Sequence, residues 1–402
     1  MTVNRRDVLK RLTAGAVGAA AVAALPGAQP TLRAVAVAAG AEAPSFHGPH
    51  QAGIFTPPQR SAVFAAFDMT VPSAGALRQT LRTLTARARF LTTGGEPDAG
   101  PITTPPADNG VLGPVVPADR LTITVSVGGS LFDGRFGLAA RKPRALTAMG
   151  VFPGDALDPA WCHGDLLLQI CADNADTVHH ALRDIARNTR GSLLLRYRRA
   201  GFLNPPRPSG APRNLMGFKD GTSNPIAAEG ADLIWAGADE PDWAAGGSYQ
   251  VLRFIRMHTE FWDRVSLAEQ EAIIGRRRDS GAPLDGFDEL DKPDYERDPA
   301  GALTPLDAHI RLANPRTAET TGGRILRRPY NYDDGLIPGG NLDAGLIFCA
   351  YQRDLRRGFE AVQRRLADDP LNDYIRPFGG GYFFALPGVT SAQDWYGRGL
   401  LD

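Results

Sequence analysis

The stretch Leu166-Leu-Leu-Gln-Ile-Cys-Ala-Asp173 has the continuous apolar content of a buried strand, and a helical pattern with arginines follows it at residues 177–190. A second stretch, Gly345-Leu-Ile-Phe-Cys-Ala-Tyr351, has the same features and its own arginine-rich helical pattern at residues 355–366. In each stretch a cysteine stands just before the turn into the helix. This internal similarity indicates that the chain contains two related halves.

The segments around these two stretches extend each half to the order β-α-β-β-α-β. In the first half we expect strands at 61–71, 121–127, 166–172 and 192–198, and helices at 74–91 and 177–190. In the second half we expect strands at 248–258, at 309–312 or 325–328, at 346–351 and at 381–386, with helices at 267–276 and 355–366. The sequence therefore predicts an α+β fold of two ferredoxin-like halves with antiparallel sheets, at residues 44–210 and 211–402.

Composition limits the classes of partner. The chain has 402 residues and a hydrophobic content of 43%, which is ample for a packed core. Lys and Arg together number 44, as do Asp and Glu, so no strong field favours nucleic acid. Three cysteines provide no disulfide framework, and Cys162-His163 lacks the preceding cysteine that covalent haem attachment needs, because Pro159 stands there.

The N-terminus resembles a twin-arginine export signal. Arg5-Arg6 is followed by an uncharged run from Leu12 to Gln29 that is rich in Ala and Gly. A transmembrane anchor is the alternative, but small residues bury little surface and Pro26 interrupts the run. We expect residues 1–43 to be cleaved and the product to be extracellular or periplasmic, without stable membrane insertion. Because this pathway exports folded proteins, often with an inserted cofactor, a cofactor is expected too.

A polar loop, Gly217-Phe-Lys-Asp-Gly-Thr-Ser-Asn-Pro225, lies between the halves. Glycines and a proline around an acid, a base, two hydroxyls and an amide are typical of a tight loop that aims side chains. The alternative is a solvated turn in which Asp220 and Asn224 bond their own backbone. Since neighbouring residues of an extended loop face opposite ways, Lys219 is expected to face solvent.

Two further segments contain candidate partners for this loop. In Leu306-Asp-Ala-His-Ile-Arg-Leu-Ala-Asn-Pro-Arg316, one histidine stands among apolar residues, as either a satisfied core side chain or a ligand. Eighteen residues after His309 comes Arg327, within Arg324-Ile-Leu-Arg-Arg328. Together with the loop and with Phe46-His-Gly-Pro-His-Gln-Ala-Gly-Ile54, these motifs resemble the dye-decolorising peroxidase family, in its exported, A-type or deferrochelatase-like bacterial branch.

The resemblance covers residue 46 to the C-terminus and implies two ferredoxin-like halves that enclose a non-covalent haem b. It makes His309 the axial ligand of the haem iron, and Asp220 and Arg327 the residues on the peroxide side. Asp220 would move the proton and Arg327 would supply a fixed positive charge. As the acceptor that orients His309 we expect Asp354, with Asp307 as a weaker alternative. Where some members of the family have an asparagine, this sequence has Pro329.

The resemblance also implies contacts to the haem edge, from Gly221, Thr222, Ser223, Asn314, Pro315 and Arg316. Arg316 is expected to face a propionate, because a forked cation matches a carboxylate. Arg276 is a second propionate candidate, or else part of a solvated helix end.

The function implied is that of a haem b peroxidase, which reduces hydrogen peroxide through a ferryl intermediate and oxidises bulky organic reductants such as dyes and phenolics. Surface aromatic residues are candidate routes for electrons from large reductants, with core packing as the favoured alternative for each one: Tyr330, Tyr332, Tyr351, Tyr374, Trp235, Trp262 and Trp395. One alternative is deferrochelatase-like release of iron from haem, beside an iron-uptake system. Another is a non-catalytic haem-binding or delivery protein. A phosphate-binding loop is disfavoured, because neither glycine-rich phosphate motif is present.

Overall fold

The computed structural model describes residues 43–402, so the predicted export signal lies outside the described residues except for Ala43. Within this range, the strands are β1 (Ser61–Met69), β2 (Thr122–Gly128), β3 (Leu166–Ala172), β4 (Leu193–Phe202), β5 (Ser248–Met257), β6 (Leu326–Arg327), β7 (Tyr330–Leu336), β8 (Leu342–Gln352) and β9 (Ile375–Ala385). The helices are α1 (Ala74–Thr93), α2 (Ala175–Asn188), α3 (Gly230–Leu233), α4 (Thr259–Trp262), α5 (Leu267–Ile274), α6 (His309–Ala313), α7 (Ala318–Thr321), α8 (Ala361–Arg365) and α9 (Arg398–Leu401). Helix α8 continues a π-helical turn at Arg356–Glu360.

The strands form two four-stranded antiparallel arrangements that are joined at their edges. The first has the order β4-β1-β3-β2 and the second the order β9-β5-β8-β7, which is the ferredoxin-like order in both cases. Strand β2 pairs with β9, and β4 pairs with β7, so the ladder closes on itself. The predicted α+β fold is confirmed, and the short strand β6 extends the second arrangement beside β8.

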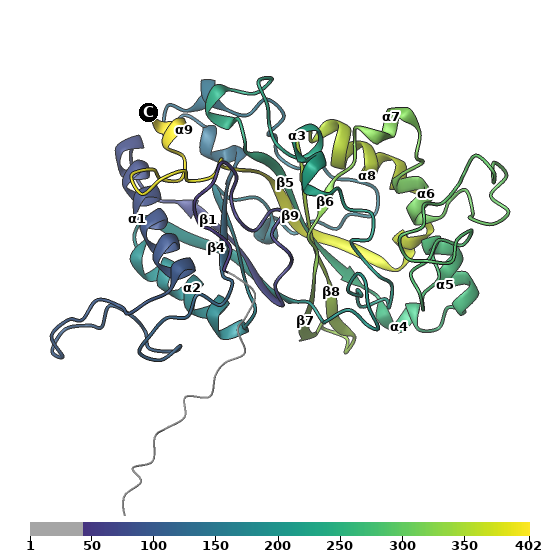
Figure 1. Ribbon diagram of the computed structural model, residues 1–402, viewed down its shortest axis with the longest axis horizontal. Helices are drawn as coiled ribbons and strands as arrows, with labels where there is room; N and C mark the ends of the chain where they lie inside the picture. Colours follow the sequence, from purple (N-terminus) through teal and green to yellow (C-terminus); the bar gives the residue numbers. More distant parts are fainter. Residues whose placement is uncertain (1–42) are drawn as a thin grey trace, which may run out of the picture. The chain divides into compact units, whose positions relative to one another are not determined.

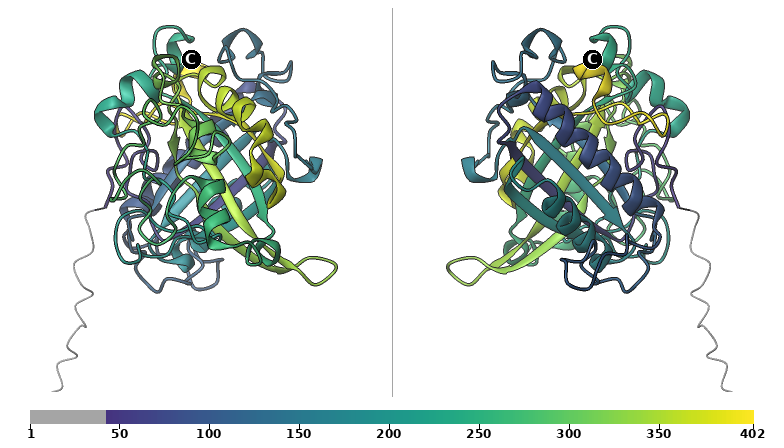
Figure 2. Two further views of the ribbon diagram at one scale, coloured as in Figure 1. Left: turned by 90° about the vertical axis from the view of Figure 1, so that its right-hand side faces the viewer. Right: turned by 90° about the vertical axis from the view of Figure 1, so that its left-hand side faces the viewer.

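Helix α1 shows how the local sequence specifies an element. Ser73 is its N-cap and accepts a hydrogen bond from the Ala76 amide, and the helix ends at Gly94, which has a φ of 74°. Leucines at helical spacing along one face of α1 are fully buried, among them Leu77, Leu81 and Leu84. Figure 2 shows α1 lying across the strands of the first half.

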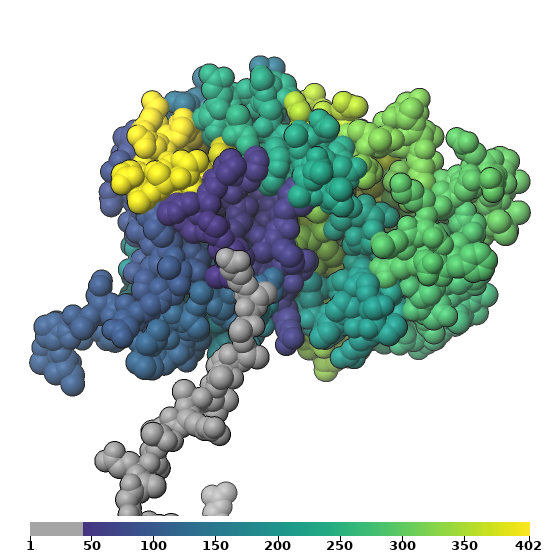
Figure 3. All heavy atoms as spheres, viewed as in Figure 1, coloured from purple at the N-terminus to yellow at the C-terminus, as the bar shows by residue number. Residues whose placement is uncertain are grey.

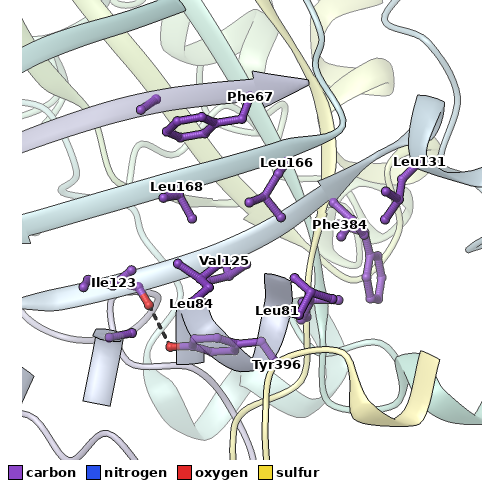
Figure 4. Packing of buried hydrophobic residues seen from close by; sticks show 14 of the residues in the cluster. Phe67, Leu81, Leu84, Ile123, Val125, Leu131, Leu166, Leu168, Phe384 and Tyr396 are labelled. Atoms are coloured by element: carbon purple, nitrogen blue, oxygen red, sulfur yellow. Dashed lines mark hydrogen bonds between the residues drawn. The ribbon is translucent and has the colours of Figure 1, made fainter. Parts of the chain in front are cut away.

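The core of the first half lies between this sheet and its helices. Figure 4 shows Leu81 and Leu84 of α1 close to Val125 and Leu168 of the sheet, and the Tyr396 hydroxyl donating a hydrogen bond of 3.1 Å to the Ile123 carbonyl. The C-terminal segment around Tyr396 therefore packs against this core. Each buried leucine contributes about 2 kcal/mol by removing its side chain from water.

The space between the two sheets is also filled by side chains. Phe64 and Leu167 of the first half contact a cluster that includes Leu252, Phe254 and Ile347 of the second half, all of them fully buried. The two halves therefore pack directly against each other on this face of the second sheet. As described below, the cavity lies on the other face of the second sheet, under the helices labelled α5, α6 and α8 in Figure 1.

The lead-in segment before β1 is anchored on the surface of the described part of the chain. The His47 backbone forms a bridge with Val389, and the His50 ring stacks on Trp235 with 3.7 Å between centroids. The His50 Nδ1 lies 2.8 Å from the Gly246 carbonyl oxygen. Figure 3 shows this segment in purple beside the yellow C-terminal residues. None of the helices in residues 43–402 is long and apolar enough to cross a membrane.

In the second half, a strand occurs at one of the two alternative places, but it is the short edge strand β6, and β7 is the second strand of the ferredoxin-like order. The segment at 325–328 contains β6, whereas residues 309–313 form α6, because the Ala308 carbonyl accepts hydrogen bonds from the amides of Arg311 and Leu312. Strand β7 was not expected, since Asp333, Asp334 and Gly335 interrupt its apolar pattern. These three residues are exposed, in a hairpin that extends away from the sheet in Figure 2.

Candidate active site

The polar loop is held by its backbone so that Asp220 faces a cavity. Gly217 and Gly221 have φ values of 88° and 104°, which L side chains rarely adopt, and they turn the chain on either side of Asp220. The Asp220 amide donates to the Pro212 carbonyl at 2.9 Å. The Asp220 side chain is 13% exposed and lines the cavity. The solvated-turn alternative is therefore wrong for this residue.

Arg327 forms an ion pair with Asp220. Its Nη1 lies 2.5 Å from the Asp220 Oδ1, across 107 residues of sequence. The Asn224 side chain fixes the Arg327 backbone, because its Nδ2 donates to the Arg327 carbonyl at 2.7 Å and its Oδ1 accepts from the Arg327 amide at 3.0 Å. Both members of the acid–arginine pair thus have fixed positions on the cavity wall.

His309, the first residue of α6, lines the same cavity. Its Nδ1 lies 2.6 Å from the Oδ2 of Asp369, whose side chain is 2% exposed. With the Nδ1 proton donated to this carboxylate, Nε2 carries the lone pair that a metal ion requires.

The expectation that Asp354 orients His309 is wrong. The Asp354 Oδ1 instead accepts hydrogen bonds from the amides of Arg356 and Arg357, at the start of the π-helical turn. Asp307 is exposed, and Asp369 occupies the position expected of either acid. An Asp-Pro pair at Asp369-Pro370 indicates a turn, but nothing in the sequence connects it with a histidine 60 residues away.

Three arginines on the cavity wall, Arg276, Arg316 and Arg365, form no ion pair among residues 43–402, and the first two lie near each other. The Arg276 Nη1 donates to the carbonyls of Gly281 and Glu289 at 2.6 and 2.9 Å, and burial, followed by the nearby Arg316 charge, lowers the Arg276 pKa. The Arg316 Nε is buried without a hydrogen-bond partner in the described part of the chain. Two adjacent unneutralised cations create a site for carboxylates.

The rest of the cavity wall is largely apolar. It includes Ile255 and Met257 of β5, Leu346 and Phe348 of β8, and Ile274 of α5. A large flat apolar group with a metal at its centre and carboxylates at its edge fits this set of residues. Imidazole would ligate the metal, the two arginines would hold the carboxylates, and Asp220 and Arg327 would remain for chemistry.

Most of the predicted site residues meet at this cavity, namely Asp220, Thr222, Ser223, Arg276, His309, Asn314, Arg316 and Arg327. Gly221 and Pro315 are not among the residues that line it. The expectation that Lys219 faces solvent is wrong, because its side chain is 4% exposed and its Nζ lies 2.5 Å from the Glu289 Oε2. Fold and site together present an imidazole, two arginines without a counter-ion and an acid–arginine pair around one largely apolar cavity, a set that fits a haem-binding enzyme.

Comparison with known proteins identifies the family. Residues 51–203 match the family model described as Dyp-type peroxidase, N-terminal, and residues 211–390 match Dyp-type peroxidase, C-terminal. The chain therefore belongs to the Dyp-type, or dye-decolorising, peroxidase family. As a member of it, this enzyme is a haem peroxidase, with hydrogen peroxide as its oxidising substrate.

Individual relatives match the chain over most of its length. A deferrochelatase of Escherichia coli strain K12 is 50% identical over 366 residues, 89% of this chain and 86% of its own. The crystal structure of a DyP-type peroxidase from Cellulomonas bogoriensis has a TM-score of 0.81 and 39% identity, covering 90% of this chain and 98% of that chain. Ferric DtpA from Streptomyces lividans has the same TM-score and coverage with 36% identity.

Proposed function

We propose that Asp220 and Arg327 activate hydrogen peroxide in this enzyme, while His309 ligates the haem iron and Asp369 orients it. The observation that supports this assignment is that the Asp220–Arg327 pair and the His309–Asp369 pair line one cavity. Haem would supply the centre that reduces peroxide and then accepts electrons from the reductants.

The two residues of the first pair have complementary tasks. Asp220 takes the proton from the peroxide oxygen that is retained and gives it to the other oxygen, which leaves as water when the O–O bond breaks. Arg327 stabilises the negative charge that develops on the leaving oxygen, and it cannot lose its proton in doing so. Since Asn224 holds the backbone of Arg327, this charge is placed before the reaction begins. No histidine is needed on this wall.

Bulky organic reductants are the proposed electron donors. Trp262 is 1% exposed and contacts the cavity-lining residues Met216, Phe218 and Met257. Its ring centroid lies 5.1 Å from that of Tyr374, which is half-buried. This pair provides a route from the cavity wall towards the surface. Tyr330, Tyr332 and Tyr351 are fully buried, so they are less suited to contact a reductant.

Deferrochelatase-like release of iron from haem is the second candidate activity, supported by the 50% identity to proteins of that name. With it we propose export by the twin-arginine pathway, from the Arg5-Arg6 segment, and a place beside an iron-uptake system. Replacing Arg5 and Arg6 together by lysine should stop export, which cell fractionation would detect as protein retained in the cytoplasm.

Absorption spectra of the purified protein, recorded before and after one equivalent of hydrogen peroxide, test the proposed function. We expect a Soret band that peroxide shifts, with the shift slowed about 100-fold or more in Asp220→Ala. In His309→Ala the haem should be lost or its ligation changed. A Soret band that peroxide leaves unshifted would instead support a haem carrier. Fluorescent metal-free porphyrin after turnover would support iron release.

A further inference from the structure

Glu289 lies at the centre of a hydrogen-bond network beneath the polar loop. Its Oε2 accepts from the Lys219 ammonium, and its Oε1 accepts from the Thr222 hydroxyl at 3.0 Å and from the Ala211 amide at 2.9 Å. Burial would raise the pKa of the Glu289 carboxyl, but these hydrogen bonds outweigh burial and the pKa is lowered. The carboxylate is therefore ionised at neutral pH and accepts three hydrogen bonds.

Two glycines leave room for this ion pair. A Cβ atom at Gly210 would lie 1.8 Å from the Glu289 Oε2, and a Cβ atom at Gly281 would lie 2.6 Å from the Lys219 Cδ. Both glycines also have positive φ values, of 77° and 81°. The backbone around residues 210 and 281 is thus shaped around the Lys219–Glu289 pair.

The network holds the residues on both sides of Asp220. Lys219 precedes Asp220 and Thr222 follows it by two positions, and both side chains bind the same carboxylate. The Lys219 ammonium group binds Glu289, and the next side chain in the loop, Asp220, binds Arg327; both residues line the cavity. The Glu289 carbonyl also accepts from Arg276, so one residue connects the polar loop with the arginines of the cavity wall.

We propose that Glu289 is a positioning residue that sets the orientation of Asp220 through Lys219 and Thr222. The proposal rests on the proposed role of Asp220 in peroxide activation. Glu289 itself is not among the residues that line the cavity, so it acts through the polar loop rather than on peroxide.

Glu289→Gln in the haem-loaded enzyme tests the proposal, because it keeps the size of the side chain but leaves Lys219 without a counter-charge. Glu296→Gln is the matched control, since Glu296 is an exposed acid of the same segment. Hydrogen–deuterium exchange should be faster by about tenfold in residues 211–224 and unchanged in α6. The Soret shift after peroxide should be slower by roughly 10- to 100-fold, because small displacements of a catalytic group have effects of this size.

A double substitution with Asp220→Asn distinguishes positioning from a separate effect. If Glu289 acts through Asp220, adding Glu289→Gln to Asp220→Asn should slow the peroxide reaction no further. Should Glu289→Gln not fold, Lys219→Met with Glu289→Gln leaves no buried unpaired charge and carries the same test.

The two measurements separate this proposal from the proposed function. Loop exchange equal to that of Glu296→Gln would overturn the positioning role of Glu289, whatever the peroxide rate. Faster loop exchange with an unchanged peroxide rate would support the positioning of the loop but refute the role of Asp220 in peroxide activation.

Discussion

Replacing Asp369 by asparagine should raise the reduction potential of the haem iron. The Asp369 carboxylate is 2% exposed and accepts from His309 through Oδ2 and from the Leu371 amide through Oδ1. A negative acceptor strengthens imidazole as a donor and so favours the ferric state. Asparagine has one carbonyl oxygen, which can serve either Leu371 or His309 but not both.

The size of this shift follows from the hydrogen bond that is lost. A buried hydrogen bond to a charged group contributes about 2 kcal/mol, which for one electron corresponds to roughly 85 mV. The His309–Asp369 hydrogen bond stabilises the ferric and the ferrous state alike to some extent, and only the difference between the two changes the potential. The value of roughly 85 mV is therefore an upper limit, and we expect a positive shift of several tens of millivolts. Spectroelectrochemical titration of the Soret band measures it directly. The iron–histidine stretching frequency of the ferrous form should fall at the same time.

Asp354→Asn is the matched control for this experiment. The Asp354 side chain bonds only the amides of Arg356 and Arg357 among the described residues, and asparagine can accept the same hydrogen bonds, so its replacement should leave both the stability and the potential nearly unchanged. The reasoning would be refuted if Asp369→Asn stayed within about 10 mV of the parent enzyme, a difference of only ~0.2 kcal/mol. An equal shift in Asp354→Asn would refute it as well.

Three further changes have outcomes that the structure specifies. Arg365 donates to the Leu312 and Ala313 carbonyls at 2.9 and 2.7 Å, at the end of α6, so Arg365→Gln should speed haem transfer to an acceptor protein about tenfold, with partial recovery in Arg365→Lys. Arg276→Ala should speed the same transfer about tenfold, whereas Arg277→Ala, at an exposed position, should not. Asp165 is buried and bonds Arg135, Ser130 and the Met69 amide, and these bonds lower its pKa despite burial. The pKa of Asp165 in the folded protein lies below the ordinary value of 3.8. The Asp165 carboxylate therefore contributes fully to the free energy of unfolding above pH 3.8, and this contribution is lost as the pH falls through the folded pKa. Asp165→Asn should therefore lower the free energy of unfolding in urea by about 2 kcal/mol at pH 7, a value already reduced because Arg135 is partly exposed. The loss should be smaller below pH 3.8.

Elements with a strong local pattern could be predicted from the sequence. Strand β3 occupies the expected residues, Leu166–Ala172, because an unbroken apolar run between turn signals has one plausible structure. Helix α1 begins where Ser73 offers a cap. Strand β7 could not be predicted in the same way, because its pairing with β8 outweighs the local preference of Asp333 and Asp334 for turns.

The partners of the site residues depend on long-range contacts, which local pattern does not encode. Alternation along the polar loop predicted that Lys219 faces solvent, and it could not show that Glu289, 70 residues away, binds the Lys219 ammonium group instead. His309 likewise required an acceptor, and the sequence offered several acids, from Asp307, two residues away, to Asp369, 60 residues away. The choice of Asp369 over Asp354 is made by the turn at residues 365–369, which brings both Arg365 and Asp369 against α6.

The position of the cavity has a related physical explanation. Along β5, Leu252 and Phe254 face the space between the sheets, whereas Ile255 and Met257 face the cavity. Both faces are apolar, and a haem macrocycle in the cavity would impose the same requirement on the side chains as a packed core does. Hydrophobic pattern therefore shows that both faces of the strand are covered, but not which face is covered by the cofactor. That distinction rests on the unpaired charges of Arg276 and Arg316 within residues 43–402, which a hydrocarbon core would not tolerate and two carboxylates neutralise.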